Sequence, residues 1–214
     1  IGRLVGSEMC IRDRLNQYPS IINTYYTDPN THACKNLPLL LMVNVNDKYY
    51  IVSFEHPDLI TISHEFINLI FKTNGTKTIF DRKRLKYYVD DIKNAIDAKV
   101  CSYLSNKNDI ENEYAENRVK DFRSVSVMVL LKHFKKLCDK VKTENYDNNL
   151  VCYEKDFSLA LYGIEKNGMN VSNFKLGSPS LVDSKNLVYG QYNMMTPTGR
   201  PSNSFGNVNY AALN

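Results

Sequence analysis

A mostly apolar run over residues 37–45 constrains the fold of this chain more than any other feature. The run is too short to cross a membrane, which takes about 20 apolar residues, and its length suits a buried strand. A polar triplet follows at residues 46–48, and residues 49–54 then combine tyrosines with Ile51 and Val52. Two strand-like runs joined by a short polar turn predict an antiparallel hairpin, and with it a fold built on a sheet.

In much of the remaining chain, apolar residues recur at the spacing of one face of a helix. Pro57 and Asp58 open an expected helix that continues through Ile70 and ends before the turn pair at 74–75. Strands followed by alternating helices and strands predict an α/β fold, with a mixed sheet and flanking helices. From residue 171 onward the chain is rich in Ser, Asn, Pro and Gly, which predicts an irregular C-terminal segment. The other expected elements are a strand over 77–80 and helices over 82–91, 97–105, 121–141 and 153–166.

Composition excludes several classes of protein. The chain has 214 residues, of which 43% are hydrophobic and 23% charged, so it is neither disordered, collagenous nor a coiled coil. No apolar stretch is long enough for a membrane span, and we therefore expect a cytoplasmic protein without a membrane partner. The formal net charge of +4 permits an anionic partner without requiring one.

Both ends of the sequence are unusual. Residues 4–13 have the sequence LVGSEMCIRD, which resembles a translated sequencing adapter, so residues 1–14 are expected to be an artefact. The alternative is a short N-terminus of biological origin. A signal peptide is disfavoured because Glu8, Arg12 and Asp13 interrupt any apolar segment. The sequence stops at Asn214 without a closing turn, and we interpret the chain as a gene fragment cut at both ends.

The cysteines and histidines show no metal-binding or catalytic spacing. Cys34, Cys101, Cys138 and Cys152 form no CxxC pair, and they are expected to be reduced, buried thiols. No Walker loop, dinucleotide fingerprint, HExxH or GxSxG motif is present. No chemistry is assigned to the four histidines, which are His32, His56, His64 and His133.

The C-terminal segment provides the most specific pattern. Residues 192–203 have the sequence YNMMTPTGRPSN, and residues 207–211 have the sequence NVNYA. This spacing resembles the T-G-R and P-N-L-Q-N segments of family A, bacterial polymerase I-like, DNA polymerases. The resemblance assigns DNA contact to six residues, which are Thr198, Arg200, Ser202, Asn203, Asn207 and Asn209. Arg200 is expected in the minor groove, whose acceptors are largely shared by all base pairs, so that contact holds DNA without reading its sequence.

Two further segments resemble the same family in the family's order. Residues 79–85 and 96–104 are similar to its 3′–5′ exonuclease-like domain, which implies an RNase H-like fold over residues 15–142. Residues 153–157 and 164–171 are similar to the opening of its polymerase domain, which implies a truncated start of that domain over residues 150–214. The thumb region between the last two motifs is shorter than in the family.

The exonuclease-like domain is expected to be inactive. Two-metal hydrolysis of a phosphodiester needs several carboxylates that converge on the ions. The resemblance puts Asn23 and Tyr25 where the family has its acidic pair, and Leu85 and Ser126 at two later Asp positions. If the first alignment is out of register, Asp28 or Asp47 could take the place of the acidic pair.

Other candidate residues have more ordinary interpretations. Asp97 is the one family carboxylate retained, yet its place at a helix start favours a capping role over a metal ligand. The basic cluster at residues 82–86 is expected to be a solvated helix face. Tyr87 and Tyr88 beside it are expected to be buried or half-buried rather than to stack on bases.

The resulting hypothesis is a fragment of a DNA-directed DNA polymerase, of viral or phage origin, that holds primer–template DNA. The complete enzyme would extend primers with deoxynucleotides and Mg²⁺, whereas this chain lacks the catalytic palm and is expected to be an inactive monomer. The hypothesis assigns it no catalytic residue and no metal ligand. Two alternatives stay open: an active 3′–5′ exonuclease, and a non-enzymatic α/β module that binds nucleic acid.

Overall fold

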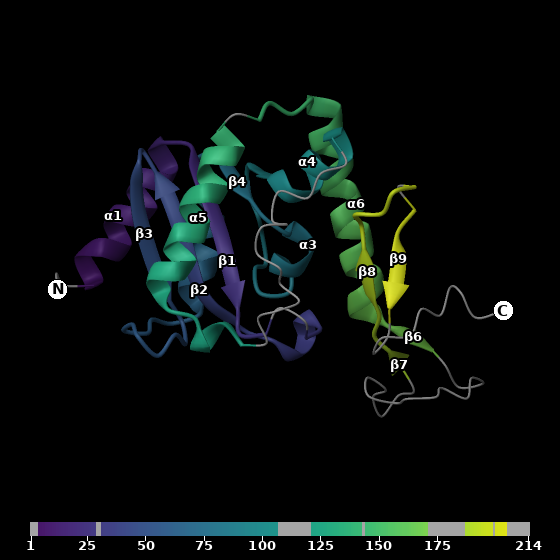
Figure 1. Cartoon of the computed structure of the whole chain (residues 1–214), viewed down its shortest axis with the longest axis horizontal. Helices are drawn as coiled ribbons and strands as arrows, with labels where there is room; N and C mark the ends of the chain where they lie inside the picture. Colours follow the sequence, from purple (N-terminus) through teal and green to yellow (C-terminus); the bar gives the residue numbers. More distant parts are fainter. Residues whose placement is uncertain are drawn as a thin grey trace.

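The computed structural model describes residues 4–28, 31–106, 121–142, 144–170, 187–198 and 200–204. Its centre is a five-stranded sheet in the order β3-β2-β1-β4-β5 (Figure 1). The strands are β1 (Ser20–Tyr26), β2 (Pro38–Val45), β3 (Lys48–Ser53), β4 (Lys77–Ile79) and β5 (Ala95–Asp97). β1, β2 and β3 are antiparallel neighbours, whereas β4 runs parallel to β1 and β5 parallel to β4. This mixed sheet confirms the predicted α/β fold class with a mixed sheet.

The predicted hairpin is present as β2 and β3. Val45 pairs with Lys48 across a two-residue turn, and both turn residues have positive φ angles, 50° at Asn46 and 57° at Asp47. Asn and Asp tolerate this conformation better than most residues, and such turns match the twist of paired strands. The turn chemistry is local, and for this reason the sequence predicted it correctly.

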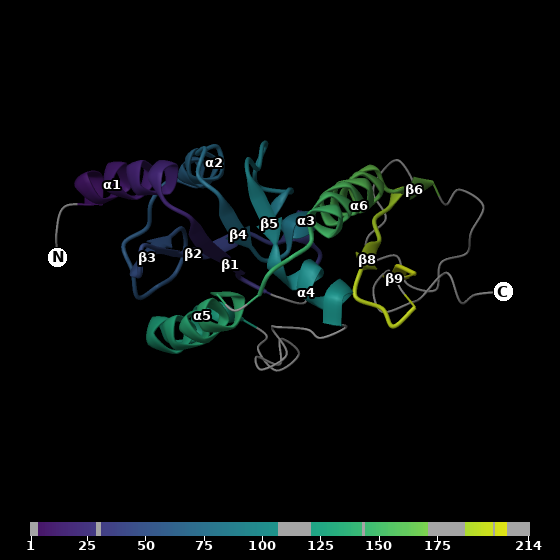
Figure 2. The ribbon, with the colours of Figure 1, turned by 90° about the horizontal axis from the view of Figure 1, so that it is seen from above.

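Helices cover both faces of the sheet, as Figure 2 shows. The helices α1 (Leu4–Gln17) and α2 (Glu65–Phe71) lie on one face, and α5 (Val127–Lys142) lies on the other. One hydrophobic cluster lies on each face of the sheet, and β1 contributes residues to both because its side chains alternate between the faces. Ile22 belongs to the cluster with Ile70 and Phe71 of α2, and Tyr25 belongs to the cluster with Leu130 and Phe134 of α5.

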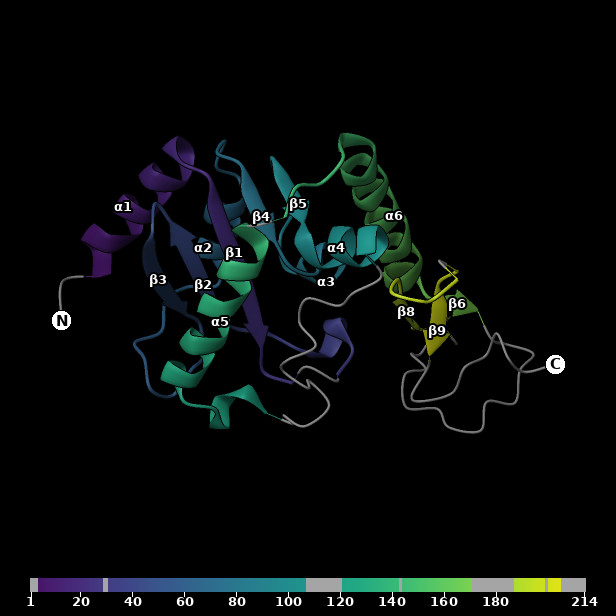
Figure 3. The same ribbon diagram turned by 45° about the horizontal axis from the view of Figure 1, so that its top comes forward.

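The remaining elements lie beyond the β5 edge of the sheet or in its connections (Figure 3). β8 and β9 form a small antiparallel hairpin next to α6, and β6 pairs with β7. The elements are the 3₁₀ helices η1 (Ala33–Lys35) and η3 (Phe122–Ser124), the helices α3 (Arg82–Leu85), α4 (Ala98–Asn106) and α6 (Asn148–Asn167), and the strands β6 (Met169–Asn170), β7 (Leu187–Val188), β8 (Gln191–Asn193) and β9 (Ser202–Ser204).

Several predicted boundaries are wrong. The helix expected from Pro57 begins only at Glu65, because Thr61 pairs with Ser53 and Ile62 N donates to the Ser53 carbonyl oxygen. The helix expected over 82–91 contains only the four residues of α3, and the strand β5 was not predicted at all. The long helix starts at Val127 instead of residue 121, and α6 starts at Asn148, five positions before residue 153.

The end of α6 agrees with its predicted stop. Gly168 follows the helix with φ 70°, a conformation that glycine adopts without a steric penalty. In the irregular C-terminal segment, residues 187–188, 191–193 and 202–204 are strands. Asn207 and Asn209 lie outside the described residues.

The predicted burial of the cysteines holds in part. Cys101 and Cys138 are buried, whereas Cys34 and Cys152 are exposed. In the described part of the chain, no helix combines the length and the apolar character that crossing a membrane requires.

Residues expected to be an adapter artefact take part in α1. Ile11 is 4% exposed and Leu15 is fully buried, and both side chains pack in the cluster on the α2 face. The identification of residues 1–14 as an artefact stays a prediction, and so do the boundaries of the two expected domains.

Candidate nucleic-acid interface

The positions expected for the first pair of exonuclease carboxylates lie on β1 and face α5. Asn23 is 6% exposed and Tyr25 is 4% exposed. The Tyr25 hydroxyl lies 2.8 Å from His133 Nδ1 and 3.2 Å from the Leu130 carbonyl oxygen. The Tyr25 ring meets Phe122 edge to face at 5.7 Å. Tyr25 therefore fills the space between β1 and α5 and is bound to protein groups on both sides.

The two later positions do not join this pair. Leu85 is 1% exposed and belongs to the cluster on the α2 face, opposite to Tyr25. Ser126 lies just before α5, where its hydroxyl oxygen accepts from Met128 N at 3.3 Å. Side chains on opposite faces of a sheet cannot bind one ion, so Leu85 is not at an exonuclease ligand position.

Asp97 caps α4, as its place before the helix predicts. One carboxylate oxygen accepts from Lys99 N (3.1 Å) and Val100 N (3.3 Å), and the other accepts from Arg82 N (2.5 Å). The residue is completely buried. Burial, followed by the charges of Glu154 and Asp81, raises the pKa of Asp97 to about 8.

Two other carboxylates follow neighbouring parallel strands. Asp28 lies just beyond β1, and Asp81 lies just beyond β4 with φ 57°. Asp81 accepts from Arg84 N at 3.0 Å, and Asp28 accepts from the Thr31 hydroxyl at 2.5 Å. The sequence placed Asp81 in the segment that resembles the exonuclease-like domain but gave it no ligand role, although a polar residue directly after a parallel strand is a recognisable signal. Asp47 lies in the hairpin turn at the other end of the sheet and pairs with Lys142.

These residues do not fit the metal pair of an exonuclease. Within the described ranges, no group of three or more His, Cys, Asp or Glu side chains is arranged to hold a metal ion. Asn23 and Tyr25, at the positions where the resemblance expects an acidic pair, carry no carboxylate, and Asp97 already accepts three backbone N–H groups. A two-Mg²⁺ site needs several convergent carboxylates, and the described donor set does not supply them.

The basic cluster is buried, which makes the prediction of a solvated face wrong. Arg82 is 2% exposed, and Lys83 and Arg84 are each 8% exposed. Arg82 Nε donates to Glu154 Oε1 at 2.9 Å, and Arg84 lies over the Tyr26 ring at 4.3 Å. The acidic partners come from α6, far along the chain, and local spacing therefore did not reveal them.

Tyr87 and Tyr88 are half-buried, as predicted. The Tyr88 hydroxyl donates to the Ala33 and Asn36 carbonyl oxygens at 2.6 and 2.9 Å, and the Tyr87 hydroxyl donates to Glu165 at 3.2 Å. Burial raises the pKa of Tyr88 to about 12. Both hydroxyls are thus engaged within the protein.

A group of three side chains, here called the hairpin clamp (Lys83, Glu165 and His32), holds β8. Tyr192 N donates to Glu165 Oε1 at 2.5 Å, and the Tyr192 carbonyl oxygen accepts from Lys83 Nζ at 2.5 Å. Lys83 and Glu165 also form an ion pair with each other, and their side chains are 9% and 3% exposed. His32 Nε2 lies 3.0 Å from the Gly190 carbonyl oxygen. The clamp therefore fixes the backbone of β8 against α3 and α6.

Four of the six predicted DNA-binding residues lie in or beside the β8–β9 hairpin. Thr198 and Arg200 are exposed, and Ser202 and Asn203 are half-buried in β9. The Arg200 backbone is held on both sides, because its N–H donates to the Thr198 hydroxyl (3.4 Å) and its carbonyl oxygen accepts from the Thr196 hydroxyl (2.6 Å). The hairpin thus brings these four residues together on one small element.

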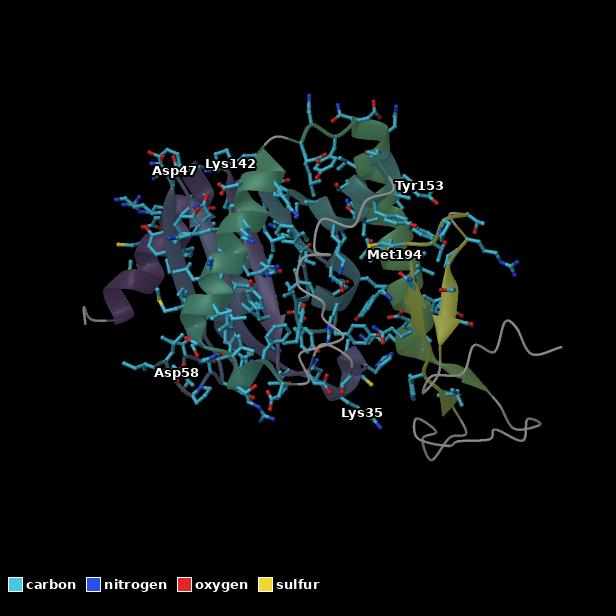
Figure 4. All side chains as sticks on the ribbon, viewed as in Figure 1. Lys35, Asp47, Asp58, Lys142, Tyr153 and Met194 are labelled. Carbon is cyan, nitrogen blue, oxygen red and sulfur yellow. The ribbon has the colours of Figure 1, made fainter. Side chains whose placement is uncertain are left out.

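A cavity of about 230 Å³ lies between this hairpin and the helices α3 and α4. Lys83, Arg84 and Lys99 line it together with Asp81, and residues 191–195 form the facing wall. Figure 4 labels Met194 on this wall, near α6. The residues of the two facing walls are about 90 or more positions apart in sequence.

Comparisons with known proteins give a limited result. No protein-family model matches the chain, and no curated protein gives a significant match. Among solved structures, the catalytic core of RRP6 from Trypanosoma brucei is similar, with 13% identity and a TM-score of 0.47 over 76% of this chain and 50% of that chain. A cysteine-to-serine mutant of the same core has 10% identity and a TM-score of 0.42 over 76% of this chain and 49% of that chain. The chain therefore spans about half the length of these structures.

Proposed function

We propose that this chain is a nucleic-acid-binding module of exonuclease-like fold that holds a strand without hydrolysing it. The observation that carries the proposal is that residues at the expected metal-ligand positions have structural roles. Tyr25 is bound to Leu130 and His133, and Asp97 caps a helix. Carboxylates that converge on a metal pair are the requirement for this type of hydrolysis, and these side chains do not meet it.

The exposed end of the β8–β9 hairpin supports the binding half of the proposal. Arg200 is exposed, and a guanidinium group offers five donors that suit phosphate oxygens or minor-groove acceptors. Thr198 beside it is also exposed and can donate to a sugar or phosphate oxygen. Such contacts position a strand without reading its sequence.

A binding titration tests this half. The full chain is titrated into labelled single-stranded and primer–template oligonucleotides over a salt series from ~50 to ~200 mM. Arg200→Ala is expected to weaken binding to every sequence and to reduce the salt slope by about 1. Arg123→Ala removes the same charge from an exposed position that is paired with Asp121, and it serves as the matched control. Equal affinities for Arg200→Ala and the control at every salt concentration would refute the assignment of Arg200.

A degradation assay tests the other half. Labelled single-stranded DNA and RNA are incubated with the chain and with Mg²⁺ or Mn²⁺, and no shortening is expected. Shortening that disappears in Asp81→Asn or Asp28→Asn would instead support the alternative of an active exonuclease, because these carboxylates follow β4 and β1.

A second candidate function is the holding of primer–template DNA within a family A DNA polymerase of viral or phage origin. The presence of Thr198, Arg200, Ser202 and Asn203 on one hairpin favours it, because that family segment binds the primer terminus. In such an enzyme deoxynucleotides and Mg²⁺ would be handled outside the present chain. A preference of at least several-fold for primer–template over single-stranded DNA, lost in Arg200→Ala, is the expected result. Sequencing the gene beyond Asn214 for an Asp-containing palm motif is the complementary test.

A further inference from the structure

Tyr153 on α6 is an exposed aromatic residue whose ring is held in place. It is 53% exposed, and its ring stacks on that of Phe157, with the centroids 5.4 Å apart and the planes inclined by 21°. Residues four positions apart lie on the same side of a helix, which explains this contact. One face of the Tyr153 ring therefore rests on Phe157, and the large exposed fraction leaves the other face accessible to solvent.

Phe157 is itself anchored to the rest of the protein. It is half-buried and packs in a cluster that includes Leu161 and Met194. Met194 is 6% exposed, and its sulfur lies 3.7 Å from the Ser158 hydroxyl. An aromatic ring that is stacked on an anchored neighbour has little rotamer freedom left to lose when a ligand binds. Tyr153 thus presents a flat surface that exists before any ligand arrives.

This surface lies beside the loop of the β8–β9 hairpin. Figure 4 labels Tyr153 close to Met194, the first residue after β8. Thr196 N donates to the Met194 carbonyl oxygen at 3.2 Å, and the Thr196 hydroxyl donates to the Arg200 carbonyl oxygen at 2.6 Å. The loop therefore leads from the aromatic cluster to the exposed Arg200. Aromatic side chains next to cations are the combination with which proteins bind single-stranded nucleic acids.

The surroundings of Tyr153 fit a nucleobase better than a protein partner. On the same side of α6, Asn149 and Asp156 are exposed polar residues one turn before and one turn after it. Among the described residues of α6, the other large hydrophobic side chain that is exposed is Ile164, about 16 Å further along the helix. A stable protein interface buries about 800 Å² of each partner, whereas a base needs only one aromatic ring.

We infer that Tyr153 is a stacking platform for one base of a single-stranded nucleic acid that runs along the β8–β9 hairpin. Every base has a π face, and stacking on an aromatic ring therefore tolerates any sequence. This agrees with contacts at the hairpin that hold a strand without reading it. The inference rests on the proposed function, because a strand has to bind before one of its bases can stack.

The chain contains no tryptophan, which makes stacking directly observable. Tyr153→Trp places the only indole of the chain on the platform, and Tyr18→Trp places it at a 42% exposed tyrosine between α1 and β1. Both variants are titrated with a thymidine oligonucleotide and with an abasic oligonucleotide of the same length, which has the phosphates but no bases. Because stacking on a base quenches indole emission, the thymidine oligonucleotide is expected to quench Tyr153→Trp alone. No quenching of this variant, or equal quenching by the abasic oligonucleotide, overturns the inference.

Binding affinities provide an independent readout. Tyr153→Ala is expected to raise the Kd of the thymidine oligonucleotide by at least about fivefold and to leave that of the abasic oligonucleotide unchanged. Tyr153→Phe keeps the ring and should bind within about twofold of the wild type. Tyr18→Ala is the control, and equal affinities for it and Tyr153→Ala overturn the inference. Urea denaturation establishes that each variant is folded, and if Tyr153→Ala is unfolded, the fluorescence titration decides the result.

The outcomes separate this inference from the proposed function. If the oligonucleotide binds with the expected dependence on Arg200 but equally well to Tyr153→Ala, the proposed function stands and the platform fails. If the oligonucleotide quenches Tyr153→Trp but is shortened when Mg²⁺ is added, the platform stands and the proposed function fails. If the wild-type chain binds no oligonucleotide, both are refuted.

A second copy of the chain is the other occupant that the test must distinguish. Sedimentation velocity of the wild type without nucleic acid is expected to show a monomer. A dimer that Tyr153→Ala converts into a monomer would identify this face as a contact between two copies and would overturn the inference.

Discussion

Arg82 of α3 and Glu154 of α6 form an ion pair in the interior of the protein. Arg82 Nε lies 2.9 Å from Glu154 Oε1, and Nη2 lies 3.3 Å from Oε2. Their side chains are 2% and 0% exposed, and they are 72 positions apart in sequence. Glu154 also accepts from the Ser158 hydroxyl at 2.9 Å, and Arg82 donates to the Ala95 carbonyl oxygen at 2.5 Å. The pair therefore fastens α6 to the edge of the central sheet.

Removal of one partner of this pair should be strongly destabilising. Arg82→Met leaves the Glu154 carboxylate buried without its cation, which costs about 3–5 kcal/mol of unfolding free energy. Urea denaturation of the wild type and the variant measures this loss. Lys72→Met breaks the exposed pair with Asp90 and is the control, with an expected cost below about 1 kcal/mol. Similar losses in the two variants would contradict the structural role of Arg82.

The hairpin clamp gives a second prediction, at the level of a single amide. Glu165→Gln removes the charge that faces Lys83 and weakens the acceptor of Tyr192 N. The Tyr192 amide is expected to exchange at least about tenfold faster with solvent, whereas the amides of β1 should keep their protection. Hydrogen exchange followed by NMR measures both, with Glu65→Gln on the exposed start of α2 as the control. An unchanged rate at Tyr192 would mean that Glu165 does not hold the hairpin.

Asp97 should make stability depend on pH. Its pKa is raised to about 8 in the folded chain by burial and by the charges of Glu154 and Asp81, compared with 3.8 as the ordinary value. Between these two pH values the folded state holds more protons than the unfolded state, and so this residue's contribution to stability falls as the pH rises. Asp97→Asn cannot titrate. The stability difference between wild type and variant is therefore expected to be smaller at pH 8 than at about pH 5, as urea denaturation at both pH values will show.

Two glycines give opposite predictions. A Cβ atom at Gly75 would lie 1.9 Å from the Leu15 carbonyl oxygen, so Gly75→Ala must displace the end of α1. We expect it to destabilise the chain by more than about 1 kcal/mol. A Cβ atom at Gly163 meets nothing within 4 Å, and Gly163→Ala in α6 should stabilise by about 0.5–1 kcal/mol. Thermal denaturation of the two variants compares them, and a neutral Gly75→Ala would show that α1 does not pack against the 73–76 turn.

The Gly75 prediction also bears on the origin of the N-terminus. Leu15 and Ile11 of α1 are buried in the cluster that includes Phe71 of α2. Natural selection would not have shaped an artefactual segment to pack in this way. The direct test compares the unfolding free energy of the chain with and without residues 1–14. An unchanged unfolding free energy after the deletion would support the interpretation as an adapter.

The parts of the fold that were predicted correctly depend on neighbours in sequence. The β2–β3 hairpin follows from two strand-like runs and an Asn-Asp turn, and the stop of α6 follows from Gly168. The start of α2 could not be predicted from local spacing, because Thr61 pairs with Ser53 of the sheet and is therefore not part of the helix. The three residues of β5 have no periodicity of their own and become a strand only by pairing with β4.

The same distinction applies to the candidate site. The sequence by itself determined that Asn23 and Tyr25 carry no carboxylate, wherever the fold places them. Only the tertiary structure decided what the basic residues do. Lys83 and Arg84 have the composition of a solvated face, yet α6 and the hairpin bury them beside a cavity. The physical reason is that a buried cation needs a partner of opposite charge. Glu165 pairs with Lys83 and Glu154 pairs with the neighbouring Arg82, from about 70 to 80 positions away, beyond the reach of any local pattern.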